Sequence, residues 1–153
     1  MTRKLKRTKD KSVIDSNGRI IFFSIERFMK DIVEGSCCFV CGASPDSKVF
    51  NDEHVLPNWI LKKYELHDKY ITLTNQTKLK YGSYVIPCCK DCNTDMGRMI
   101  EEPIRNILLK GYDEVVKHIE KNGIMLFYVW MALIFTKTHL KVTLTPKNPP
   151  AKS

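Results

Sequence analysis

The spacing of apolar residues predicts short strands near the start of the chain and a helix behind them. Residues 19–23 form a short apolar run that favours a strand. From Ser24 onward, apolar side chains recur at positions i, i+3, i+4 and i+7, which is the period of an amphipathic helix. Ser24 is a suitable N-cap for this helix and Gly35 a suitable end. An alternating segment follows around residues 48–55.

The pattern becomes mainly helical towards the C-terminus. Pro57 can open a helix, and residues 70–74 and 81–86 favour two strands because β-branched and aromatic side chains dominate them. Pro103 is expected to end or kink a helix that starts near residue 93. Two glycines then separate three further helical segments, which predicts an α+β fold with a small sheet flanked by several helices.

The longest apolar run covers residues 124–135. A helix needs about twenty apolar residues to cross a bilayer, so this run predicts a buried helix and no membrane partner. A docking face for a protein partner is the alternative interpretation. The N-terminus is charged and has no apolar stretch of the kind a secretory signal contains. The sequence therefore predicts a cytoplasmic protein in a reducing compartment.

The net charge of +8 is concentrated at the two ends of the chain. Residues 1–12 carry six Lys and Arg against Asp10, and residues 137–153 carry four Lys and no acid. The remainder is close to neutral. We predict a basic flexible arm at 1–18, a folded domain at 19–140 and a flexible tail at 141–153. Basic ends can bind a polyanion such as nucleic acid, or can serve solubility alone.

Six cysteines fall in two clusters, and each cluster contains one C-x-x-C pair. The pairs are Cys38 with Cys41 and Cys89 with Cys92. Four thiolates of this kind can close a tetrahedral site, which favours structural zinc, with iron as the alternative. Gly42 would let the chain turn after the first pair. The remaining two, Cys37 and Cys88, are expected in the core.

The two pairs are separated by forty-seven residues, more than a simple zinc ribbon has. This insertion contains Glu53-His54-Val55-Leu56-Pro57, and Asn93 directly follows the second pair. In these motifs, over about residues 36–105, the chain resembles the HNH endonuclease family in its four-cysteine, zinc-bound form. The resemblance implies a small ββα-metal core held by a four-cysteine zinc clasp, and an enzyme that hydrolyses phosphodiester bonds in DNA.

The resemblance assigns roles to three residues. His54 matches the histidine that acts as general base on the attacking water, Glu53 matches an acidic ligand of a catalytic divalent cation, and Asn93 matches a further ligand of that cation. Carboxylate and amide oxygens suit Mg²⁺ or Mn²⁺. Because neighbouring strand residues face opposite sides, Glu53 and His54 can serve one site only where the strand bends or ends. Asn93 can instead cap the helix that follows it.

One element of the family pattern is absent from this sequence. The Asn that normally lies a few residues before the second C-x-x-C, and braces the base, is missing, and Asn75 is a candidate substitute. Glu101 is expected to pair with Arg98 or Arg105 at helical spacing. The alternative function is a non-catalytic zinc-ribbon module that binds nucleic acid. In either case DNA contacts are expected from basic residues around the motifs: Lys62, Lys63, Lys78, Lys80, Lys90 and Arg98.

Overall fold

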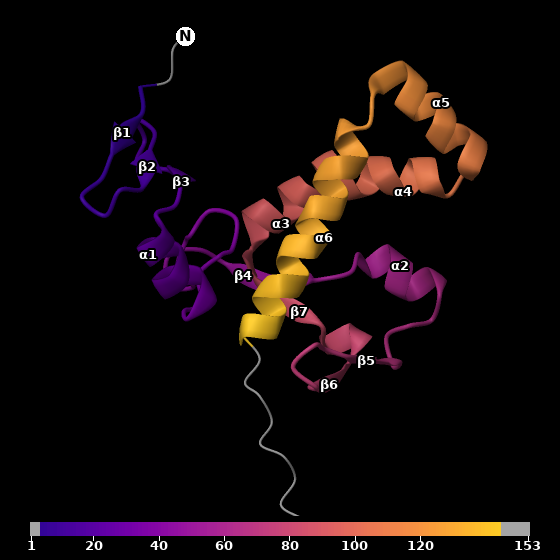
Figure 1. Ribbon diagram of the computed structural model, residues 1–153, viewed down its shortest axis with the longest axis horizontal. Helices are drawn as coiled ribbons and strands as arrows, with labels where there is room; N and C mark the ends of the chain where they lie inside the picture. Colours follow the sequence, from indigo (N-terminus) through magenta and orange to yellow (C-terminus); the bar gives the residue numbers. More distant parts are fainter. Residues whose placement is uncertain (1–3, 145–153) are drawn as a thin grey trace, which may run out of the picture. The chain divides into compact units, whose positions relative to one another are not determined.

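A computed structural model describes residues 4–144 of the chain (Figure 1). It is a mixture of helices and small antiparallel sheets, which confirms the predicted α+β class. The described residues form two compact units, one of residues 4–52 with 87–92 and the other of residues 53–86 with 93–144. The division of the sequence into arm, domain and tail stays a prediction, and residues 145–153 of the predicted tail lie outside the described residues.

The first unit begins with a three-stranded antiparallel sheet in the order β1-β2-β3. Its strands are β1 (Lys6–Arg7), β2 (Val13–Ile14) and β3 (Ile20–Phe22). The predicted strand at 19–23 is therefore confirmed. The segment predicted as an arm contains the first two strands.

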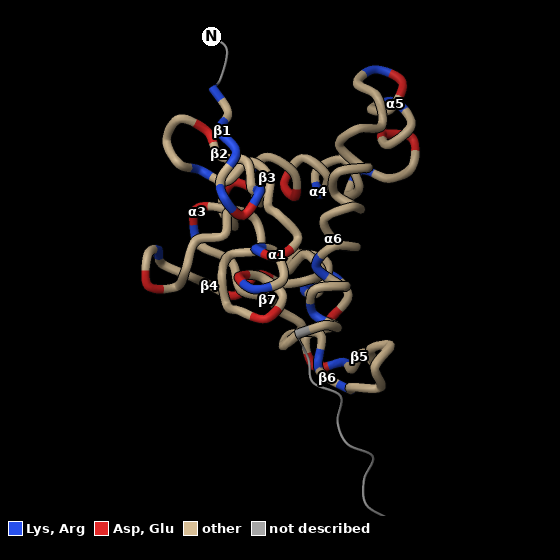
Figure 2. The backbone as a smooth tube through the Cα atoms, turned by 60° about the vertical axis from the view of Figure 1, so that its left-hand side comes forward, with Lys and Arg blue, Asp and Glu red and all other residues tan. Residues whose placement is uncertain are grey.

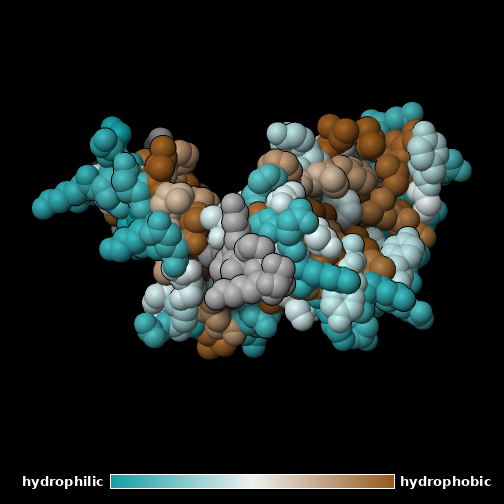
Figure 3. All heavy atoms as spheres, turned by 60° about the horizontal axis from the view of Figure 1, so that its bottom comes forward, coloured by the Kyte–Doolittle hydropathy of each residue, from teal (hydrophilic) through white to brown (hydrophobic). Residues whose placement is uncertain are grey.

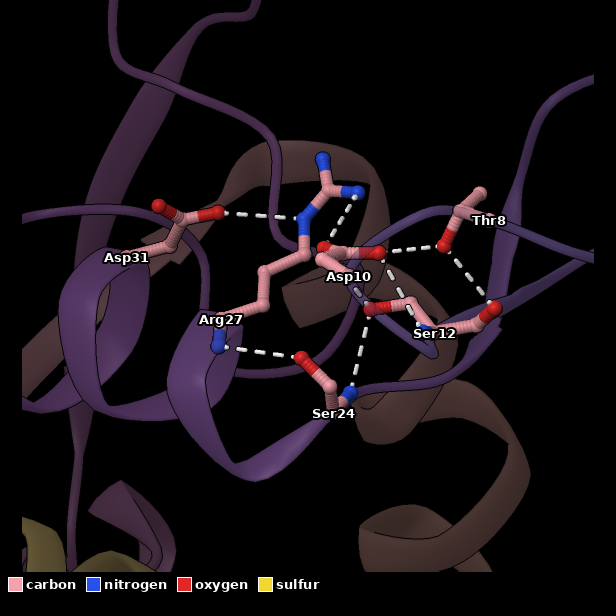
Figure 4. A network of polar contacts seen from close by, with 6 residues as sticks. All are labelled: Thr8, Asp10, Ser12, Ser24, Arg27 and Asp31. Atoms are coloured by element: carbon pink, nitrogen blue, oxygen red, sulfur yellow. Dashed lines mark hydrogen bonds and ion pairs between the residues drawn. The ribbon is translucent and has the colours of Figure 1, made fainter.

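A polar network joins the turn between β1 and β2 to the residues that follow the sheet (Figure 4). The hydroxyl of Ser12, which is fully buried, accepts a hydrogen bond from the Ser24 backbone N–H at 3.0 Å. Asp10 accepts from the Ser12 hydroxyl and from the hydroxyl of Thr8, and lies 3.6 Å from the Arg27 guanidinium. Together these bonds tie the β1–β2 turn to the start of the next helix.

That helix begins and ends where the sequence predicts. Helix α1 (Ile25–Phe28) continues into a π-helical turn, η1 (Met29–Val33). The Ser24 hydroxyl accepts from the Arg27 N–H at 3.1 Å, which is an N-cap. A β-carbon on Gly35 would lie only 2.6 Å from the Asp31 carbonyl oxygen, so the chain needs glycine to leave the helix there.

Strands β4 (Phe50–His54) and β7 (Val85–Cys89) pair with each other. Backbone bonds from Val55 to Tyr84 and from Lys90 to Val49 flank the pairing and make it antiparallel. The predicted strand at 81–86 is only partly present, because residues 81–83 form a 3₁₀ turn, η2 (Tyr81–Ser83), ahead of β7. Helix α3 (Lys90–Met96) follows β7 without a connecting loop.

The second unit contains helix α2 (Asn58–Lys63), which begins after Pro57 as predicted, and a hairpin of β5 (Tyr70–Thr72) and β6 (Lys78–Lys80). Its core includes side chains that are at most 2% exposed: Val55, Leu61, Tyr84, Ile86 and Ile104. The predicted end or kink at Pro103 takes the form of a change of helix type, because residues 90–108 are helical throughout. A π-helical turn, η3 (Gly97–Glu101), separates α3 from α4 (Glu102–Leu108), because proline has no N–H for the helical ladder.

Two more helices complete the second unit: α5 (Tyr112–Asn122) and α6 (Met125–Leu144). Gly111 and Gly123 flank α5 with positive φ angles, as expected for glycine at helix ends. Helix α6 packs against η3 and α4. It is longer than the predicted segment 124–135, because nothing in the following residues stops a helix before residue 144.

The apolar part of α6 is less buried than the sequence predicts. Met125, Tyr128, Met131 and Phe135 are all more than half exposed, and other apolar side chains also reach the surface, as the brown spheres of Figure 3 show. The prediction of a core helix over 124–135 is wrong for this face. Among the described residues, no single helix is both long and apolar enough to cross a membrane. Helices α5 and α6, bent by 112° between them, satisfy that criterion only as a pair, by length and composition.

Candidate functional site

The four cysteines of the two C-x-x-C pairs converge in the first unit. Their Sγ atoms all lie within 4.8 Å of one another, and those of Cys41 and Cys89 are 3.7 Å apart. Sulfurs at the corners of a tetrahedron, each about 2.3 Å from a central zinc ion, are about 3.8 Å apart. The four thiols are therefore spaced so that they can hold a metal ion such as zinc.

The turn that carries the first pair is built by backbone hydrogen bonds. The Gly42 N–H donates to the Cys38 carbonyl at 2.8 Å, and the Cys38 N–H donates to the Ala43 carbonyl at 2.9 Å. Gly42 has a φ of +70°, and a β-carbon there would lie 2.7 Å from the Phe23 ring. The predicted need for glycine after Cys41 is thus confirmed, for reasons of both conformation and space.

The four thiols cannot all be charged without a cation among them. Hydrogen bonding from Cys88 lowers the pKa of Cys38 to about 4. Burial and the neighbouring thiols raise the pKa values of Cys41 and Cys92. A bound divalent cation would remove this conflict, because its charge stabilises all four thiolates.

The other two cysteines differ from each other in burial. Cys88 is fully buried, as predicted, and its Sγ lies 3.8 Å from that of Cys38. Cys37 is only partly buried, and its pKa is raised by that burial.

The end of β4 carries the predicted catalytic pair in the second unit. The Glu53 side chain is only 10% exposed, and His54 is half-buried beside it. The Glu53 carboxylate accepts a hydrogen bond from the Lys137 ammonium at 2.7 Å. The same ammonium donates to the His54 backbone carbonyl at 2.8 Å. A single lysine from α6 therefore holds both residues of the predicted pair.

Lys137 is the site residue that the sequence did not predict. Its side chain is 2% exposed, although by sequence it belongs with the basic C-terminal end. No motif marks it, and it lies eighty-four positions after Glu53. Only its place soon after the apolar first half of α6 could have drawn attention to it.

Glu101 is the second carboxylate beside Lys137. Its Oε1 lies 3.6 Å from the ammonium, whereas the sequence predicted pairing with arginine. Arg98 pairs with Asp95 instead. Burial raises the pKa of Glu101, the Lys137 charge opposes that rise, and the Glu53 carboxylate adds to it. Glu101 also lines a cavity of about 450 Å³ that Asn93 lines as well.

The divalent cation that the family resemblance implies would need oxygen ligands. Glu53, Glu101 and Asn93 offer carboxylate and amide oxygens, which are the ligands that Mg²⁺ and Mn²⁺ prefer. The ammonium of Lys137 already places a positive charge beside the two carboxylates. The two carboxylates therefore already share one cationic side chain.

A second cavity is connected to the predicted base through two side-chain contacts. The rings of His54 and His67 meet edge to face with centroids 6.3 Å apart, and His67 Nε2 lies 2.9 Å from Asn58 Oδ1. Asn58 lines a cavity of about 680 Å³ whose charged lining residues are all basic. The full lining consists of Asn58, Trp59, Lys62, Lys63, Arg105 and Leu109. Trp59 and Arg105 also line the cavity of Asn93 and Glu101.

The remaining predicted contact residues are spread over other elements (Figure 2). Lys78 and Lys80 lie on β6, where Lys80 pairs with Asp68 at 2.7 Å, and Lys90 opens α3. Asn75, the candidate substitute for the missing Asn, accepts from the Thr77 N–H and donates to the Val142 carbonyl. It therefore holds the β5–β6 turn against α6.

Comparisons with protein-family models, with curated proteins and with solved structures give no match to this chain.

Proposed function

We propose that the chain is a metal-dependent endonuclease of the HNH type, which hydrolyses phosphodiester bonds in DNA. The observation that carries the proposal is the order and pairing of three elements. Strand β4 ends in Glu53 and His54, its partner β7 ends in Cys89, and helix α3, which contains Cys92 and Asn93, follows β7 directly. A strand pair followed by a helix is the arrangement expected of a ββα-metal core with a zinc clasp.

In this proposal His54 accepts the proton of the attacking water. Histidine is the side chain that most often serves as a general base near neutral pH. Lys137 fixes the backbone of His54, and Glu53 and Asn93 hold the catalytic cation. When bound, Mg²⁺ or Mn²⁺ offsets the negative charge that develops on the phosphate in the transition state.

The basic cavity supports the same proposal from the substrate side. Lys62, Lys63 and Arg105 supply positive charge with no acid among the lining residues. Trp59 gives an aromatic face on which a base can stack. The cavity is linked to His54 through His67 and Asn58, which supports a path for bound DNA from the cavity towards the predicted base.

The test is nicking of supercoiled plasmid by the zinc-loaded full chain, with and without Mg²⁺ or Mn²⁺. Withholding the divalent cation is preferable to EDTA, which also strips zinc from a thiolate site. His54→Ala should slow cleavage by at least about 100-fold, the usual contribution of a general base. His139→Ala, at an exposed histidine of α6, is the matched control and should cleave like the wild type. Equal cleavage by the two variants would refute the catalytic role of His54.

A non-catalytic nucleic-acid-binding module is the second candidate, and one observation favours it. The Glu53 carboxylate is already paired with a buried lysine, which is what a site without a metal would need. This candidate predicts salt-dependent oligonucleotide binding by a wild type that does not nick plasmid with any divalent cation.

A further inference from the structure

The buried ammonium of Lys137 has no role in the proposed hydrolysis beyond fixing His54. A fully buried lysine is rare in proteins unless acceptors surround it. Here its Nζ lies 2.7 Å from Glu53 Oε1, 2.8 Å from the His54 carbonyl oxygen and 3.6 Å from Glu101 Oε1. The ammonium therefore lies between oxygen atoms in the way a metal cation would.

The charges around this position are not balanced by Lys137 alone. Glu53 and Glu101 can contribute two negative charges against one positive charge. Their side chains are 10% and 22% exposed, so water screens their repulsion only weakly. A divalent cation would satisfy both carboxylates at once.

We propose that Lys137 and a divalent cation are alternative occupants of the position between Glu53 and Glu101, with Glu101 as a further ligand of the bound cation. This inference deepens the proposed function and rests on it for the identity of the cation site. Lys137 then sets the cation concentration that the site requires. Its flexible four-carbon stem allows the ammonium to leave the carboxylates when a cation arrives.

The experiment measures Mn²⁺ binding to the zinc-loaded full chain, from the loss of the electron paramagnetic resonance signal of free Mn²⁺. Lys137→Met keeps the length and apolar stem of the side chain but removes its charge. It should bind Mn²⁺ at least about tenfold more tightly than the wild type, because a buried carboxylate without its counter-ion gains more from a new cation. Lys121→Met removes one exposed lysine from the end of α5 and is the control for net charge.

The ligand role of Glu101 is tested by Glu101→Gln, which should weaken Mn²⁺ binding about tenfold in both the wild type and Lys137→Met. This variant also keeps the inference testable if Lys137→Met does not fold, as judged by circular dichroism. An affinity for Mn²⁺ that is the same in folded Lys137→Met and Lys121→Met, or that is unchanged by Glu101→Gln, would overturn the inference.

Binding and cleavage separate this inference from the proposed function. If the Mn²⁺ affinities follow the predicted order while no protein nicks DNA, the cation site is supported and the nuclease is refuted. If cleavage depends on His54 but Lys137→Met leaves Mn²⁺ affinity unchanged, the nuclease stands and the competition between Lys137 and the cation is refuted.

Discussion

Asp10 shows how a single side chain can stabilise a short sheet. Its carboxylate accepts hydrogen bonds from Thr8 and Ser12 and lies near Arg27, in the network of Figure 4. The bond from Thr8 is the main cause of its lowered pKa, and the bonds from Ser12 and the Arg27 charge add to it. The ionised carboxylate therefore favours the folded state, although the exposure of Asp10 keeps the effect small.

We predict that Asp10→Asn lowers the unfolding temperature at pH 6 by a small amount, and that this difference disappears in acid. The carboxyl has a lower pKa in the folded state than its ordinary 3.8, so its contribution is complete above that value. It is lost as the pH falls through the lowered pKa. Thermal unfolding followed by circular dichroism from pH 6 to pH 3 checks the trend. A difference that stays constant across this range would contradict it.

The sequence identified most, but not all, of the candidate residues. The four cysteines were found because the C-x-x-C spacing is local and each pair forms within a single turn. Lys137 was missed because its partner Glu53 is distant in sequence, and lysine is normally exposed. Pairing of Glu101 with arginine was expected from helical spacing, but η3 places the carboxylate near Lys137. Local rules do not capture contacts made by a later helix.

Among the elements, the turn after Cys38 depends most clearly on one residue. Gly18 and Gly42 both have positive φ angles, but only Gly42 is crowded, by the ring of Phe23. Gly18 has no atom within 4 Å of the position that a β-carbon would take. Substituting each glycine by alanine therefore distinguishes two costs in stability. Gly18 reports the left-handed backbone alone, and Gly42 reports the backbone together with steric crowding.

Gly18→Ala should destabilise the protein by about 1–2 kcal/mol, the cost of a left-handed conformation for a residue with a β-carbon. Gly42→Ala should cost about 1–3 kcal/mol more, because the Phe23 ring must also move. Urea unfolding of both variants gives the comparison. Equal losses of unfolding free energy in the two variants would mean that the turn at Gly42 accommodates the β-carbon without further strain.

The paired C-x-x-C turns should hold one zinc ion per chain. Cys89→Ser removes one of the four converging thiols and should lose the metal together with a large part of the stability, because metal binding and folding are coupled. Cys37→Ser changes a neighbouring thiol outside the group of four. This variant should keep both the bound metal and the stability of the wild type. Metal analysis and thermal unfolding measure the two effects.

Two results would contradict the zinc prediction. One is a metal-free wild type with the same unfolding temperature as the loaded protein. The other is visible absorbance from bound iron, the alternative that four cysteines leave open.

Helices were easier to predict than strands because their ends carry clear local signals. Ser24, Gly35, Gly111 and Gly123 mark helix ends in both the sequence and the structure. The segment 81–86 was predicted as a strand from its side chains, yet its first half forms a 3₁₀ turn. Strand propensity describes how a residue fits a partly buried sheet, so it cannot fix where pairing begins.

At the scale of the whole molecule, the position of the basic residues matters more than the net charge. Along the sequence, the excess charge lies at the two ends. The structure removes Lys137 from that exposed set, because it is buried beside Glu53, and gathers Lys62, Lys63 and Arg105 around one cavity. Lys6 and Arg7 lie on β1, where the hairpin holds them in extended backbone.

We predict that the basic cavity, more than the N-terminal hairpin, binds the phosphates of duplex DNA. Replacing Lys62, Lys63 and Arg105 together with Gln should lower the slope of log Kd against log salt by up to about 2.7, or about 0.9 for each phosphate that is no longer neutralised. Replacing Lys6, Arg7 and Lys9 makes the same change in net charge at exposed positions and should lower the slope less. Fluorescence anisotropy of a labelled duplex between about 50 and 200 mM salt measures both slopes. A larger fall of this slope in the hairpin variant would assign DNA binding to the basic N-terminus. An unchanged slope in the cavity variant would show that the cavity does not contact the DNA phosphates.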